Sequence, residues 1–206
     1  FMNSAPSESL VAVAARRAIA VLGLLAALYG MANVMPAIGD FRLGPFPMEM
    51  FRASFFALCT VLVGCALLAD ATGRNKPWVK LVSVVGVATI LYGCWSFYQV
   101  SIKLDEDMFL FGPREAAIAL SVAAASLFFC WRLWGGPVAL LGIVGIAYLL
   151  TGEYWPGATR LVTGDLHELL AQNLWYSLDT GILGATFSIV ISTVLPFIIL
   201  GALLEG

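Results

Sequence analysis

The sequence predicts an all-α integral membrane protein with about six transmembrane helices and one interfacial amphipathic helix. Hydrophobic residues make up 61% of the 206 residues, charged residues make up 12%, and the mean hydropathy is +0.92. Soluble domains carry about 25% charged residues, roughly twice this fraction. The apolar residues also come in long blocks, and about 20 of them in a helix cross the ~30 Å hydrocarbon core of a bilayer.

The apolar blocks place six crossings along the chain. The first block ends at Met35-Pro36, and Pro137 opens the fifth at a first-turn position where its missing N–H is not needed. The expected spans are 16–38, 50–69, 79–102, 114–134, 137–152 and 182–205.

Loop charges predict the orientation of these spans. The segments 103–107 and 153–179 are mainly acidic and fall on one side of the predicted topology. The basic residues on the other side are Arg16, Arg17, Arg74, Lys76, Lys80 and Arg132. Because cytoplasmic loops carry an excess of Lys and Arg, we expect both termini to be cytoplasmic.

Aromatic residues near the span ends fit the same topology. Amphipathic rings favour the headgroup level of a bilayer, and this explains them better than a ligand-binding role does. The residues concerned are Trp78, Trp95, Tyr98, Trp131, Trp134, Tyr154, Trp155 and Trp175.

The segment 157–180 predicts an external amphipathic arm. Asp165 and Glu168 have the spacing of a capping box at a helix N-terminus. Its charges would be costly at mid-bilayer, so we expect an arm on the membrane surface or on a neighbouring subunit, not a seventh crossing. The leucines expected on one face are Leu166, Leu169, Leu170, Leu174 and Leu178.

The sequence offers no candidate catalytic, cofactor-binding or metal-binding residue. The single histidine, His167, lies on the arm, whereas a transmembrane haem or pigment needs axial ligands inside the bilayer. The cysteines lie in apolar stretches without a C-x-x-C pair, and we expect small buried side chains. They are Cys59, Cys65, Cys94 and Cys130. We therefore expect no enzyme, no cofactor and, without a basic patch, no nucleic-acid partner.

Charged residues are almost absent from the predicted helix interiors. Arg52 and Arg114 sit near helix starts, Arg132 near an end and Glu205 at the last position of the final span. Proton- or ion-coupled transport needs intramembrane charges, so this sequence has no visible ion path. The serines and threonines of the helices are expected to bond to their own backbone or to a neighbouring helix. The abundant glycines, Gly64, Gly93, Gly145 and Gly201 among them, are expected to allow close helix packing.

The order of elements and two local motifs carry a family resemblance. The motifs are Gly152-Glu153-Tyr154-Trp155-Pro156-Gly157, and Thr180-Gly181-Ile182-Leu183-Gly184 followed by Phe197 and Gly201-Ala202-x-Leu204-Glu205. The chain resembles the fused permeases of the TRAP (tripartite ATP-independent periplasmic) transporters, whose small four-helix subunit is joined by a linking helix to a large subunit. The match is concentrated at 152–205, while residues 1–150 fit in helix count and orientation.

The resemblance implies four parts. They are a small-permease-like module over 1–134, a linking helix over 135–156, the arm over 157–180, and a truncated first helix of a large-permease-like module over 181–206. The family's transport domain, with its sodium and substrate sites, would follow Glu205, so none of those residues has a counterpart here. Pro196 stands where an aliphatic residue is expected, and it should kink the last helix or loosen an i−4 bond.

Two functions follow as expectations. The first is a non-catalytic scaffold of a TRAP-type permease in a bacterial inner membrane, serving organic-acid uptake with a large permease partner and a periplasmic substrate-binding protein. The second is a truncated permease-like protein that serves as a structural subunit of a larger assembly, such as a photosynthetic or respiratory complex. A small independent channel or exporter is a weaker third option, because it would need a polar pore lining that the sequence does not offer.

Overall fold

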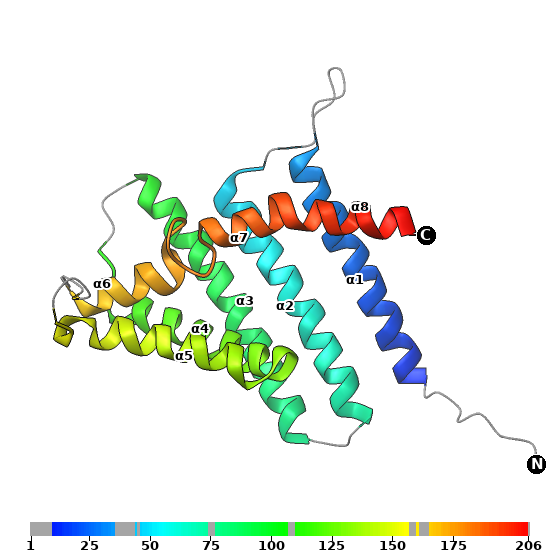
Figure 1. The fold of residues 1–206 in the computed structure, drawn as a ribbon, viewed down its shortest axis with the longest axis horizontal. Coiled ribbons are helices and arrows are strands. Elements are labelled where there is room, and N and C mark those ends of the chain that lie inside the picture. The colour runs from blue at the N-terminus through cyan, green and yellow to red at the C-terminus, as the bar shows by residue number, and fades with distance from the viewer. Residues whose placement is uncertain are drawn as a thin grey trace, which may run out of the picture.

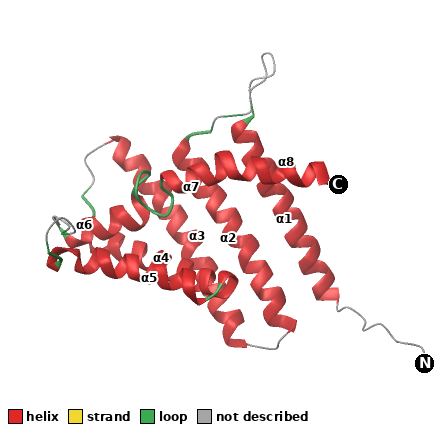
Figure 2. Cartoon of the chain, in the orientation of Figure 1, coloured by secondary structure: helices red, strands yellow, loops and turns green. Residues whose placement is uncertain are grey.

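The computed structural model describes residues 10–35, 44, 46–73, 77–106, 110–156, 160 and 165–205. Within these ranges every regular element is helical (Figure 2). Among the described residues, six helical segments are long and apolar enough to cross a membrane. The predicted fold class is therefore confirmed. The predicted loop residues Arg74 and Lys76, and residues 36–38 of the first span, lie outside the described residues.

The long helices begin earlier than predicted, and those of the second and third spans also end later. They are α1 (Leu10–Val34), α2 (Met48–Gly73), α3 (Pro77–Glu106), α4 (Pro113–Trp134) and α5 (Gly136–Thr151), which a 3₁₀ turn, η1 (Gly152–Tyr154), follows. α1 ends two residues before Pro36, because a residue that precedes proline disfavours the helical conformation. The turn between α4 and α5 uses Gly135, whose φ of 92° favours glycine.

The helices fall into two groups in Figure 1. α1, α2 and α3 lie side by side, and α2 contacts both neighbours. α4 packs on α3, and α5 packs on α4, with both running across α3 in this view. The main core lies where α3, α4 and the arm meet, and it includes Ile90, Phe97 and Val122.

The last predicted span is one helical segment, Ala185–Glu205, with a π-helical turn inside it. It consists of α7 (Ala185–Ile189), a π-helical turn η4 (Val190–Val194) and α8 (Leu195–Glu205). The amide of Leu195 donates to the carbonyl of Val190, five residues back, just before Pro196. Proline has no N–H for the carbonyl four residues earlier, so the expected loosening is observed as a π turn at this point. α7 and α8 run across the upper parts of α2 and α1 in Figure 1, and α8 contacts α1.

Glycine permits close helix approach at several of the predicted positions. A Cβ at Gly64 would collide with Val87, and one at Gly93 would collide with Val122. At Gly145 and Gly201 a Cβ would meet nothing within 4 Å. The prediction of close packing is therefore right for the first two glycines and wrong for the last two.

Helix hydroxyls mostly bond as predicted. The hydroxyl of Thr60 donates to the carbonyl of Phe56 at 2.8 Å, and that of Ser192 donates to the carbonyl of Ser188 at 2.8 Å. The buried hydroxyls of Ser83 and Ser126 have no hydrogen-bond partner within the described ranges.

Candidate functional site

The arm packs into the helix bundle. It forms α6 (Leu166–Ala171), a π-helical turn η3 (Gln172–Tyr176) and a series of turns that lead into α7. α6 packs on α4 and η3 contacts both α3 and α4. Leu170 and Leu174 of the arm are therefore buried against helices of the same chain, without a neighbouring subunit. The place of the arm relative to the membrane surface stays a prediction.

The start of the arm helix follows the sequence prediction in part. The carboxylate of Asp165 accepts a hydrogen bond from the backbone amide of His167 at 3.1 Å, as an N-cap residue does. Glu168 was expected to complete a capping box with Asp165. Its carboxylate accepts a hydrogen bond from the side-chain amide of Gln172 at 3.1 Å. On the leucine face, Leu170 and Leu174 are buried, whereas Leu166 is exposed.

Trp175 fixes the middle of the arm. Its side chain is 0% exposed, and its indole N–H donates to the carbonyl of Gly93 on α3 at 2.9 Å. The rings of Phe56 and Phe97 meet it edge-on, at centroid distances of 5.7 and 6.2 Å. The prediction of Trp175 as a headgroup-level residue is wrong, because the indole N–H finds a partner on a facing helix.

Tyr176 makes a second polar contact between the arm and α3. Its hydroxyl lies 2.7 Å from the hydroxyl oxygen of Ser96. Its ring stacks on Phe97 and packs against Phe111. Burial raises the pKa of the Tyr176 phenol above its ordinary value of 10.0, and the hydrogen bond with Ser96 opposes this shift.

Arg52 joins α2 to the turns at the end of the arm. One guanidinium nitrogen, Nη1, donates to the carbonyls of Leu178 at 2.7 Å and Leu183 at 3.0 Å. The other, Nη2, lies 3.6 Å from the sulfur of Met48. Only 7% of the Arg52 surface is exposed, and Nε has no partner among the described residues. Arg52 lies near the start of α2, as predicted, but it is buried there.

The turns that Arg52 holds depend on glycine. Gly184 donates its amide to the carbonyl of Gly181 at 2.8 Å, and a Cβ on Gly184 would lie 2.7 Å from that oxygen. The hydroxyl of Ser177 accepts from the amides of Asp179 and Thr180. The Gly-x-x-Gly motif at 181–184 thus forms a compact turn before α7, and helix does not begin at Ile182 as predicted.

The histidine and the cysteines considered in the sequence analysis form no metal site within the described residues. Within the described residues, no three His, Cys, Asp or Glu side chains gather as metal ligands. His167 is exposed. Cys59, Cys65, Cys94 and Cys130 are free thiols, of which Cys94 is buried.

The arrangement centred on Arg52, Trp175 and Tyr176, which we call the arm junction, can hold one helical segment against a bundle. Sequence reasoning missed the role of Arg52, and its signal was an arginine four residues into α2, just before a long run without charged residues. No protein-family model, no curated protein and no solved structure matches this chain.

Proposed function

We propose that this chain is a non-catalytic membrane scaffold of the TRAP-permease type, which fixes the first helix of a large-permease-like module to a small four-helix module. The observation that carries the proposal is the arm junction. Arg52 and Trp175 tie the arm to α2 and α3, and the arm leads directly into α7 and α8. A rigid connection of this kind suits a part that braces a moving transport domain.

The exposed side of the last helix supports a partner in the membrane. Phe197, Leu203 and Leu204 are 69%, 72% and 79% exposed. Helix association in bilayers depends on packing between such faces. In this proposal the partner is a large permease subunit, the complete system takes up organic acids with a periplasmic binding protein, and the location is a bacterial inner membrane with both termini cytoplasmic.

The same exposed face favours a second candidate. A structural subunit of a photosynthetic or respiratory complex would also need an apolar helix face for a large partner, and α8 offers one without any catalytic group of its own.

Purification of the tagged chain from its native membranes separates the two candidates. A large permease subunit and a binding protein in the eluate would support the transport scaffold. Stoichiometric pigment-binding or respiratory subunits would support the second candidate and exclude the first. The double variant Phe197→Ala, Leu203→Ala should lower partner recovery, whereas Leu141→Ala, on the equally exposed face of α5, should not.

Recovery of the chain alone under mild extraction would contradict both candidates. An equal loss of the partner with Leu141→Ala would show that α8 is not the specific contact.

A further inference from the structure

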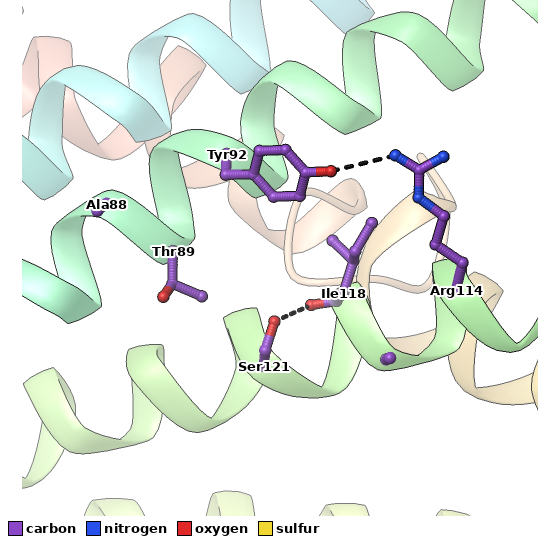
Figure 3. Close-up of a pocket in the computed structure, with 7 residues that line it drawn as sticks. Ala88, Thr89, Tyr92, Arg114, Ile118 and Ser121 are labelled. Atoms are coloured by element: carbon purple, nitrogen blue, oxygen red, sulfur yellow. Dashed lines mark hydrogen bonds between the residues drawn. The ribbon is translucent and has the colours of Figure 1, made fainter.

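A groove lies between α3 and α4 (Figure 3). Its volume is about 570 Å³. Its lining residues come from both helices and include one cation and no acidic side chain. They are Ala88, Thr89, Tyr92, Arg114, Ala117, Ile118 and Ser121.

Arg114 supplies the charge at one end of the groove. It lies in the first turn of α4, and its Nη2 donates to the hydroxyl of Tyr92 at 3.2 Å (Figure 3). Its neighbour Glu115 instead accepts from the backbone amide of Gly112 at 3.0 Å. A guanidinium carries five N–H donors, so the contact with Tyr92 leaves donors for a phosphate.

The rest of the groove is suited to an apolar chain. Ala117 and Ile118 follow Arg114 along α4, toward the middle of that span. The hydroxyls of Thr89 and Ser121 donate to carbonyls of their own helices, at 2.9 and 2.8 Å. Polar groups satisfied in this way do not oppose contact with hydrocarbon.

The groove therefore has a cation at the headgroup end of a membrane-spanning helix and an apolar floor that leads into the span. We propose that it binds an anionic phospholipid, with the phosphate on Arg114 and an acyl chain over Ala117 and Ile118. The bilayer supplies this ligand because α3 and α4 are both candidate membrane spans. A ligand of uniform polarity would not match both the cation and the apolar floor. Lipid binding here does not depend on the proposed scaffold function.

The test is native mass spectrometry of the full chain in detergent with equal amounts of phosphatidylglycerol and phosphatidylcholine. We expect the chain to retain phosphatidylglycerol preferentially. Arg114→Gln should lower that preference about tenfold, the effect of losing one charged hydrogen bond. Arg132→Gln, which removes the same charge near the other end of α4, should leave the preference unchanged.

A second variant tests the chain-binding part of the groove. Ala117 is exposed, so Ala117→Leu should fold normally, fill the floor and lower phosphatidylglycerol retention while Arg114 is intact. Equal retention of the two lipids, equal effects of Arg114→Gln and Arg132→Gln, or displacement by inorganic phosphate alone would each overturn the proposal. Melting temperatures of all variants establish that the comparison is between folded proteins.

Discussion

Arg52 is positively charged at a position with little access to water. Burial of a charge in a protein or membrane interior is unfavourable unless hydrogen bonds compensate it. The carbonyls of Leu178 and Leu183 provide that compensation, and in return two carbonyls of the irregular turn gain a donor. The arginine and the turn therefore stabilise each other.

Arg52→Met is expected to loosen the arm. The variant loses two charged hydrogen bonds, and hydrogen bonds between membrane helices contribute less than those in soluble proteins. Arm docking should therefore be destabilised by about 1–3 kcal/mol. Hydrogen exchange of the amides at 177–184 should accelerate, while that of α3 should change little. Arg52→Lys should give an intermediate effect, because an ammonium lacks the fork of the guanidinium. Unchanged exchange at 177–184 in Arg52→Met would show that the contacts do not hold the arm.

Tyr176 predicts a loss of arm docking at alkaline pH. Burial raises the pKa of its phenol, so the docked form stays neutral where a released phenol, with a pKa near 10.0, ionises. Docking stability is therefore full below that pKa and falls as pH rises toward the raised pKa of the docked state. Tryptophan fluorescence between about pH 9 and about pH 11 should report release of Trp175.

Tyr176→Phe provides the control for this titration. It removes the hydrogen bond to Ser96 at every pH, but it should also remove the part of the alkaline transition that belongs to Tyr176. An identical transition in this variant would assign the change to other groups.

At the scale of elements, α3 and α4 approach closely because Gly93 has no side chain. A Cβ there would collide with Val122 and would also lie 3.5 Å from the ring of Trp175. The same glycine offers the carbonyl that Trp175 binds. Helix packing and arm docking thus share one residue.

Gly93→Ala is expected to destabilise the protein by about 1–3 kcal/mol through overpacking. Gly145→Ala is the matched control, because a Cβ there meets nothing within 4 Å and alanine favours a helix more than glycine does. Thermal unfolding in detergent should separate the two variants. A melting temperature equal to that of the unchanged protein for Gly93→Ala would mean that α3 and α4 can move apart without loss of stability.

The sequence predicted most helix boundaries well and the last helix less well. Apolar length, Pro36 and Pro137 locate the first five spans to within a few residues, except that α1 begins at Leu10. Pro196 predicted an irregularity, but not that the helix would begin only at Ala185. That start depends on the turn at 181–184, which Arg52 stabilises from a distant part of the chain.

At the scale of the whole molecule, the loop charges predict that the turn before α4 and the turn after it lie on opposite sides of the membrane. Leu110 and Trp134 are 84% and 76% exposed at these turns. In a variant without native cysteines, Leu110→Cys should react with an impermeant thiol reagent in spheroplasts, and Trp134→Cys only after permeabilisation. The reverse pattern would invert the orientation, and reaction of both would contradict a crossing by α4.

The sequence by itself determined the membrane class, the helical fold and most span positions, because a bilayer imposes a minimum apolar length on each crossing helix. The tertiary structure decided how the arm is used. Arg52 and Trp175 find carbonyl partners 126 and 82 residues away along the chain. No local pattern encodes such pairs, because an apolar leucine face and a tryptophan are equally compatible with a membrane surface and with the interior of a helix bundle. Only the packing of α2, α3 and α4 around the arm selects between these two environments.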